Sequence, residues 1–568
     1  MKKQMGRRKI RLNTFKHVSL LILIGAFAAL LFSDIGYTCE KEALSACRTA
    51  WLNSQRLGSR SSPPSGVTVQ TGFPIVTSDV HCAAGVMYDL DGDGNHEAIF
   101  GTAMSPRTGN LHWAFDAVWA TKGDGKCPDG WPITVPSHVC SGPAVGNITG
   151  TSDVEVVFGS NQDPGDTAYK PDHKVYAAAN DGSTISGFPV SLSKGKAMAI
   201  PTLANLDQDG ALEILIGTAG YYVDTGSIRT RYEGRIVGID GDGSILSAWN
   251  ITATNASIMC SAAIGDLYES NGSYSGHEVV FLVTRFDNPT GLETAPTLWQ
   301  EIWIYDSSGN RIINYDIGNE NDSKVDGFGV ASPAIGQIFS YGNNDIKSNL
   351  VVLTENKTVS GTQDGEIQIY HIAPTGSTIE LVLDWSTEAT VQTVDTFKAS
   401  PAIADIDNDG DNEVVAYTKK GTLYVADPSG GTINLYGTQL VTGAWTSYPC
   451  SDMKVPGPIL INVGTDSTLE IILATLPATL GGTSYIKVIE YDGSSWPAFS
   501  TAFSIELDAY PVATICAGDM DSDSKVEVIA QAYNVGGLVW CYEFDDSTYS
   551  STCWPCECGD PQRTGCAD

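Results

Sequence analysis

The sequence predicts an all-β protein folded as an eight-bladed β-propeller, with seven blades as the fallback if one degenerate unit merges with a neighbour. Three observations predict this fold. A nine-residue acidic loop recurs along most of the 568 residues. A short β-branched run and an Asp-Gly type of turn follow each loop, as expected for strands. No long helical periodicity interrupts the pattern, and repeated four-stranded units are typical of propeller blades.

The clearest loop spans residues 89–97, where oxygen-bearing side chains occupy alternate positions and Glu97 closes the motif. Equally acidic copies span residues 205–213, 405–413 and 519–527. Oxygen ligands at this spacing suit a hard cation such as calcium. Because carboxylates that converge in a turn repel one another, a bound cation would remove that penalty and couple binding to folding.

Weaker copies occupy the gaps between the strong ones. Residues 147–155 and 462–470 keep the spacing with fewer carboxylates. Two further copies are recognisable from their flanks: Asp266 precedes a loop stretched before Glu278, and Gln337 has almost no acidic neighbours. The first positions are 89, 147, 205, 266, 337, 405, 462 and 519, so the intervals are 58, 58, 61, 71, 68, 57 and 57 residues. The sequence therefore contains eight units, two of them with insertions.

Each unit has the same internal order. An apolar lead-in such as 400–404 precedes the loop, a β-branched run such as 212–217 follows, and a third segment such as 235–243 ends in a turn. Gly-Phe-Pro or Gly-Trp-Pro often closes the unit. The chain enters the array through such an element, 72–74, and leaves through 538–544. We therefore expect an N-terminal strand to complete the last blade and protect its edge.

The lead-in, acidic loop and β-branched run ending in Phe-Gly or a similar pair resemble FG-GAP (VCBS) repeats. Such repeats build the calcium-binding propeller of integrin α-subunits and occur in secreted prokaryotic proteins. The resemblance covers about residues 70–550. It implies several structural Ca²⁺ ions, bound by side chains at loop positions one, three, five and nine and by the backbone carbonyl at position seven.

The resemblance gives these candidate metal ligands: Asp89, Asp91, Asp93, Asn95 and Glu97; Asn205, Asp207, Asp209, Ala211 and Glu213; Asp405, Asp407, Asp409, Asp411 and Glu413; Asp519, Asp521, Asp523, Lys525 and Glu527; and, in the weaker loops, Asn147, Asp153, Glu155, Asn462, Asp466 and Glu470. No metal is assigned to the loop at 337. The segment 554–565 also resembles one that accompanies such repeats in secreted prokaryotic proteins.

Composition divides the chain into four parts: 1–33, 34–70, 71–546 and 547–568. The first is basic and then apolar, which predicts a secretory signal peptide or an uncleaved N-terminal anchor. The second predicts a short helix and a flexible linker. The third is the propeller, and the fourth is a Cys-rich tail. We therefore expect a secreted or cell-surface protein, attached to a membrane only if the N-terminal segment is retained.

Beyond residue 33 the chain carries 26 basic and 66 acidic residues, a formal charge of −40. This charge argues against nucleic acid or anionic lipid as a partner. Thirteen cysteines in an exported chain predict disulfides. Candidate pairs are Cys82 with Cys140 and Cys39 with Cys47, and the cluster Cys553, Cys556, Cys558 and Cys566 is read as disulfides in preference to a zinc site.

No catalytic constellation is evident in the sequence. His81 and His138 occupy equivalent places in adjacent units, which reflects the repeat, and there is no Gly-x-Ser-x-Gly, His-Glu-x-x-His or phosphate-loop motif. The favoured hypothesis is an adhesion or recognition propeller for an extracellular protein or glycan. Two alternatives remain: a calcium-dependent polysaccharide lyase of the rhamnogalacturonan lyase type, or a structural component of the cell envelope.

Overall fold

The computed structural model describes residues 63–564 with internal gaps, within a compact unit that spans Arg60–Asp568. The gaps are 78–83, 103–115, 137–138, 140, 161–172, 193–194, 196, 225–228, 270–275, 288–296, 318–330, 342–344, 358–362, 376–377, 388–395, 430, 442–455, 477–482, 492–498, 508–509, 512, 534–536, 546, 550–553 and 561. The predicted signal or anchor (1–33) and the helix at its C-terminal side lie outside the described residues. Every regular element of the described part is a β-strand. It contains no helix long and apolar enough to cross a membrane.

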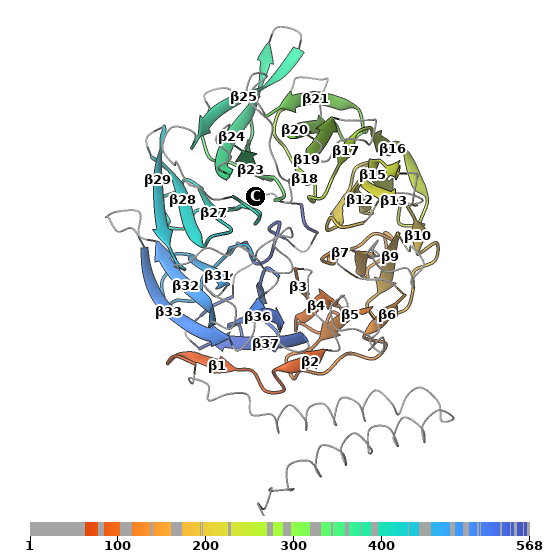
Figure 1. Cartoon of the computed structure of the whole chain (residues 1–568). Helices are drawn as coiled ribbons and strands as arrows, with labels where there is room; N and C mark the ends of the chain where they lie inside the picture. Colours follow the sequence, from red (N-terminus) through yellow and green to blue (C-terminus); the bar gives the residue numbers. More distant parts are fainter. Residues whose placement is uncertain are drawn as a thin grey trace, which may run out of the picture. The chain divides into compact units, whose positions relative to one another are not determined.

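Eight four-stranded antiparallel blades form a ring, as the sequence predicts (Figure 1). Blade 1 contains β3 (Val86–Tyr88), β4 (Glu97–Gly101), β5 (Asp116–Thr121) and β6 (Ile133–Val135); blade 2 contains β7 (Ala144–Gly146), β8 (Glu155–Gly159), β9 (Lys174–Ala179) and β10 (Val190–Ser191). Blade 3 contains β11 (Thr202–Ala204), β12 (Glu213–Thr218), β15 (Gly234–Ile239) and β16 (Ile245–Ala253); blade 4 contains β18 (Ala263–Gly265), β19 (Glu278–Asp287), β20 (Thr297–Tyr305) and β21 (Arg311–Asp316), with β17 (Ala256–Ser257) beside β19.

The second half of the ring repeats this order. Blade 5 contains β22 (Ala334–Gly336), β23 (Asn349–Lys357), β24 (Gln363–Thr375) and β25 (Thr378–Ser386); blade 6 contains β26 (Ala402–Ala404), β27 (Glu413–Tyr417), β28 (Thr422–Ser429) and β29 (Thr432–Gln439). Blade 7 contains β30 (Ile459–Ile461), β31 (Glu470–Thr475), β32 (Ser484–Tyr491) and β33 (Phe499–Leu507); blade 8 contains β35 (Cys516–Gly518), β36 (Val526–Tyr533) and β37 (Gly537–Phe544), with β34 (Tyr510–Pro511) beside β36.

The N-terminal end of the described chain closes the ring. Strands β1 (Val67–Val69) and β2 (Ile75–Thr77) both pair antiparallel with β37, so they supply the outer strand that blade 8 otherwise lacks. This confirms the predicted closure. Because both edges of the array are now hydrogen-bonded, neither is left open to pair with another chain.

The β-branched runs form the second strand of each blade and are buried on both faces. All five residues of β4 and of β8 are buried, and so are all six of β12 and β31. A strand covered on both faces reads as a continuous apolar run, because neither side meets water. Side chains of adjacent blades interdigitate: Ile461 and Ile472 of blade 7 share one core cluster with Val528 and Trp540 of blade 8.

The longer repeat units place extra chain in hairpins. In blade 3, β13 (Tyr221–Asp224) and β14 (Arg229–Tyr232) form a separate two-stranded hairpin. The pairing of β23 with β24 continues for eight residue pairs, and that of β19 with β20 for nine, against four in the equivalent pair of blade 6. Since these hairpins join the second strand to the third, they lie on the face opposite the loops between the first and second strands.

The Gly-Phe/Trp-Pro elements and the Asp-Gly turns, which the sequence presents as separate signals, lock together between neighbouring blades. Gly187 of blade 2 has a φ of 91°, and a Cβ atom there would lie 1.9 Å from the carbonyl oxygen of Asp242 in blade 3. Gly72 makes the same close approach to Asp124, and Gly130 to Asp181. Only glycine meets both the left-handed backbone and the contact.

The segment that follows β37 occupies the middle of the ring (Figure 1). Trp554 exchanges backbone hydrogen bonds with Leu460 of blade 7, and the carbonyl groups of Gln562 and Thr564 accept from Leu203 of blade 3 and Ile264 of blade 4. We call residues 554–564 the central segment. The sequence treats them as part of a separate Cys-rich tail, because a segment without periodicity carries no signal of where it docks.

Arg563 anchors the central segment and is fully buried. Its guanidinium group donates to the carbonyl oxygens of Gly85 at 2.7 Å and Pro143 at 3.1 Å, which begin the inner strands of blades 1 and 2. The buried carboxylate of Glu557 accepts from the hydroxyl groups of Ser400 (3.1 Å, blade 6) and Thr514 (3.2 Å, blade 8). The central segment therefore contacts seven of the eight blades through described hydrogen bonds.

Within the described part of the chain, no disulfide links two cysteines. Cys556 and Cys558 are both buried in the central segment. The predicted partners Cys39, Cys47, Cys82, Cys140, Cys553 and Cys566 lie outside the described residues, so those pairings stay predictions.

We expect Gly187→Ala to lower the free energy of unfolding more than Gly431→Ala does. Gly431 has a similar φ of 84°, and a Cβ atom added there would meet nothing within 4 Å, so its replacement reports backbone strain alone, about 1 kcal/mol. Gly187→Ala adds the clash with Asp242, which we expect to cost about 2 kcal/mol more. Chemical denaturation of both variants measures the difference, and equal losses would contradict the interlock.

Candidate metal centres on one face of the ring

Each acidic loop joins the innermost strand of its blade to the second strand. The closing Glu is the first residue of that second strand, or the second residue in blade 8, and it is buried in every blade that has it. One carboxylate oxygen accepts the backbone N–H of the second loop residue: Leu90 at 2.9 Å from Glu97, Ile406 at 2.8 Å from Glu413. The same bond recurs for Ile148 and Glu155, Leu206 and Glu213, Leu267 and Glu278, Val463 and Glu470, and Met520 and Glu527.

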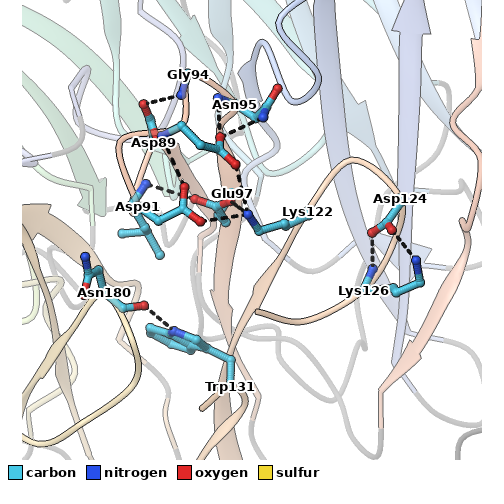
Figure 2. A network of polar contacts seen from close by, with 12 residues as sticks. Asp89, Asp91, Gly94, Asn95, Glu97, Lys122, Asp124, Lys126, Trp131 and Asn180 are labelled. Carbon is cyan, nitrogen blue, oxygen red and sulfur yellow. Dashed lines mark hydrogen bonds and ion pairs between the residues drawn. The ribbon is translucent and has the colours of Figure 1, made fainter. Parts of the chain in front are cut away.

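The earlier acidic positions fold the loop onto itself. In the loop of blade 6, Asp405 accepts the backbone N–H groups of Asp409 and Gly410 at 3.1 and 3.0 Å, and Asp409 accepts that of Asp411 at 3.0 Å. Blade 1 repeats these bonds at Asp89 and Asp93 (Figure 2). The backbone winds through left-handed conformations, as at Asn408 with a φ of 62°. The carboxylates are therefore directed to one point.

The four strong loops each bring three carboxylate oxygens within 4.8 Å of one another. These groups are Asp89, Asp91 and Glu97; Asp207, Asp209 and Glu213; Asp405, Asp407 and Glu413; and Asp519, Asp521 and Glu527. Asp523 joins a further group with Asp521 and Glu543. The remaining predicted ligands, Asp93, Asn95, Asn205, Ala211, Asp409, Asp411 and Lys525, belong to the same loops but not to these three-carboxylate groups. Several of these acidic groups could hold a metal ion.

Orphaned oxygen atoms fit a cation at these points. The second carboxylate oxygen of Glu413, Oε1, is buried without a hydrogen bond, and Glu97 and Glu527 have the same unbonded atom. Asp519 also buries one carboxylate oxygen, Oδ1, without a partner. A buried polar atom without a partner costs free energy, and a coordinated ion would recover it. The donor set consists only of oxygen, which matches the preference of calcium.

Without a cation, the buried carboxylates resist ionisation. Burial raises the pKa of Glu413 to about 9, and repulsion from Asp407, Asp427 and Asp405 adds to the effect. Burial likewise raises the pKa of Glu527 to about 8 and that of Glu97 to about 7. A divalent ion would reverse this shift, because it favours the charged form of every ligand.

The weaker loops are built differently. In blade 2, the hydroxyl group of Thr149 donates to Glu155 at 2.9 Å, and Asn147 donates to the carbonyl group of Thr151. In blade 7, Asn462 donates to the carbonyl oxygen of Asp466 at 2.5 Å, beside Glu470. Neither loop, nor the loop that holds Asp153, forms a three-carboxylate group among the described residues.

Blade 5 replaces the closing Glu with an amide. Asn349 begins β23, and its Oδ1 accepts the N–H of Ile338 at 3.1 Å, as the Glu does elsewhere. Its Nδ2 donates to the hydroxyl group of Tyr341 at 2.6 Å and to Asp384 at 3.2 Å. An amide supplies the donor as well as the acceptor, which is consistent with the absence of a predicted metal at residue 337.

The loops also join neighbouring blades. The N–H of the eighth loop residue donates to a carbonyl oxygen near the start of the preceding loop: His96 to Asp519 at 2.8 Å, and Leu212 to Asn147 at 2.9 Å. Leu469 donates to Ile406 at 3.3 Å in the same way. Each loop therefore positions the next, and an ion that orders one loop would stabilise the contact between two blades.

The sequence reasoning missed the residue that faces the closing Glu from the third strand. In blade 1 this is Lys122, whose ammonium group lies 2.8 Å from Asp91, 3.1 Å from Asp93 and 3.5 Å from Glu97 (Figure 2). In blade 6 it is Asp427. A usable signal was the spacing from the turn, because in blades 1, 3 and 4 this residue stands three positions before a left-handed glycine such as Gly125.

No protein-family model and no curated protein sequence matches the chain. Among solved structures, the chain is similar to the exotype rhamnogalacturonan lyase YesX, with 10% identity, a TM-score of 0.35, and coverage of 83% of this chain and 90% of that chain. It is similar to BBS1N in complex with ARL6DN (11%, 0.34, 84% and 94%) and to the plexin A4 extracellular region (8%, 0.37, 83% and 52%). At such values the comparisons bear on the fold and carry no argument about function.

We expect the metal-free protein to lose stability as the pH rises from about 5 to 9. The folded pKa of Glu413, about 9, exceeds its value of about 4.3 in an unfolded chain, so the folded state binds more protons over this range. Each such Glu lowers the free energy of unfolding by up to about 1.4 kcal/mol per pH unit. Thermal unfolding of dialysed protein at several pH values measures the slope.

Glu413→Gln is the matched variant for this measurement, because the amide keeps the acceptor for Ile406 without the charge. Its slope should be shallower than that of the unmodified protein, and saturating calcium should flatten both. A metal-free protein whose stability rises over the same pH range would contradict the assigned pKa shifts.

Proposed function

We propose that the chain is an exported, calcium-stabilised β-propeller that acts as an adhesion or recognition module for a protein or glycan at the cell surface. The observation that carries the metal part of the proposal is the group around Glu413. There Asp405 and Asp407 place their oxygens beside a buried carboxylate oxygen that has no hydrogen bond. The export part rests on the basic and apolar N-terminal sequence.

A structural role for the ions suits the position of the loops better than a catalytic one. The carboxylates are used in turning the loop, and the loops bond to one another between blades. Calcium takes six to eight oxygen ligands, so a loop that fills this shell offers no open position to a substrate. The ions would also offset part of the large negative charge of the chain.

The shape of the ring directs a ligand to its outer loops. The central segment fills the channel, which removes the usual concave site along the axis. The extended hairpins of blades 4 and 5, β19–β20 and β23–β24, provide additional surface on the face opposite the acidic loops. Binding residues are found on such loops more often than on the scaffold that carries them.

Calcium should raise the thermal transition of the purified protein, residues 67–568, and a chelator should lower it. At a hundredfold excess over Kd, each site adds about 2.7 kcal/mol. Magnesium should be less effective, because it requires a smaller, near-octahedral shell. Asp407→Asn should reduce the calcium-dependent shift, whereas Glu380→Gln, which removes an exposed carboxylate of β25 away from the loops, should leave it unchanged. A transition insensitive to calcium would exclude the metal proposal.

The recognition role is tested on an array of immobilised glycans and extracellular-matrix proteins, with calcium present throughout. We expect saturable binding that is lost when the tip of the β23–β24 hairpin is replaced by a two-residue turn, with the thermal transition retained. Rhamnogalacturonan is included with analysis of its chain length. Shortening of this polymer would favour the lyase alternative, and the absence of binding to every probe would favour an envelope component.

A further inference from the structure

One residue faces the closing Glu, or Asn349, from the third strand in every blade. In blade 2 the pair is Glu155 with Ala179, and in blade 8 it is Glu527 with Glu543. Extending the antiparallel register by one position gives the other pairs: Glu97 with Lys122, Glu213 with Asp240, Glu278 with Asp306, Asn349 with His371, Glu413 with Asp427, and Glu470 with Glu490. We call this residue the facing residue. Its side chain lies on the same side of the sheet as the Glu.

The facing residue of blade 1 is the only lysine of the eight. Lys122 reaches two of the three carboxylates that make up the metal group of its loop, Asp91 and Glu97, and also contacts Asp93. Its ammonium group therefore lies among the oxygens that a metal ion would need (Figure 2). A buried set of carboxylates requires positive charge, and here the chain itself supplies it.

The facing residue of blade 6 has the opposite charge. Asp427 is only 4% exposed, and its Oδ2 accepts the hydroxyl group of Tyr491 at 2.6 Å. It lies close enough to Glu413 and Asp407 to repel both. No lysine, arginine or histidine forms an ion pair with this group in the described part of the chain, and Glu413 keeps its unbonded buried oxygen.

Blade 8 has an acidic facing residue whose charge is met from outside the metal group. Glu543 accepts from Lys525 at 2.5 Å and from Gln70 at 2.8 Å. Lys525 also pairs with Asp523 but has no described contact with Asp519 or Glu527, where unbonded oxygens remain. A lysine near a loop is therefore insufficient to fill the metal position. Its ammonium group must reach the closing Glu, as that of Lys122 does.

We propose that the facing residue selects the cation of each blade: Lys122 supplies the positive charge of the blade 1 loop in place of a divalent ion, whereas Asp427 adds a carboxylate to a divalent-ion site in blade 6. The proposal rests on the proposed calcium binding. It separates loops that are almost identical in sequence, since residues 89–97 and 405–413 differ mainly in what faces them.

The test is the number of calcium ions bound per chain, measured by equilibrium dialysis with the full exported protein. Lys122→Met keeps most of the side-chain volume and removes the charge, so the count should rise by one. Lys126→Met is the control, because Lys126 lies on the same turn and pairs only with Asp124, at 2.5 Å, away from the loop. Its count should match that of the unmodified protein.

A second pair of variants locates the added ion. Asp91→Asn should leave the count unchanged in the unmodified protein and abolish the gain in the Lys122→Met background. Asp427→Asn, which still offers an acceptor to Tyr491, should weaken calcium binding at one site by about tenfold or more. The metal-free Lys122→Met protein should unfold at a lower temperature, because its carboxylates have lost their counter-charge, and calcium should restore the transition.

The outcomes separate the two proposals. If the unmodified protein binds calcium, but Lys122→Met gains no ion or Asp91→Asn alone loses one, the selection by the facing residue is wrong and the calcium scaffold stands. If neither the unmodified protein nor Lys122→Met binds calcium, the proposed function itself fails.

Discussion

The structure depends on a buried carboxylate at the start of the second strand of seven blades. Its hydrogen bond to the second loop residue fixes the loop, and its free oxygen creates the need for positive charge. An uncompensated charge in such a place costs several kcal/mol, so each blade must resolve it. The chain does so in different ways: with Lys122 in blade 1, with a hydroxyl group from Thr149 in blade 2, and with the amide of Asn349 in blade 5. Blades 3, 6 and 8 leave the oxygens grouped and accessible to an ion.

Contacts between blades follow from the same repeat. On one face, each loop bonds to the loop before it. At the outer side, the close approach of Gly187 to Asp242 ties one blade to the turn of the next. Along the axis, Arg563 and Glu557 bridge blades that are not neighbours. A propeller without a cation would lose order first in the loops, while the other two sets of contacts remain.

The repeat made the fold predictable. A period near 58 residues, acidic loops and Asp-Gly turns sufficed for eight blades, for the closing N-terminal strand and for the three-carboxylate groups. The facing residue was not predictable with the same ease, because strand pairing brings it to the closing Glu from 14 residues away for Asp427 and from 25 residues away for Lys122. The central segment was missed because its bonds are to carbonyl and amide groups of distant strands, and such bonds leave no pattern in the residues around Arg563.

The position of the central segment also constrains how the propeller assembles. Residues 554–564 follow all eight blades in the chain, yet they bond to blades 1, 2, 3 and 4 across more than 250 residues. Strands β1 and β2 must likewise wait for β37. Both closures form contacts of very high sequence separation, which are slow because their loop-closure entropy must be met first. An incomplete chain therefore has a ring that is open at its edge and empty at its axis, and native protection against proteolysis should arise only after the final residues have been made.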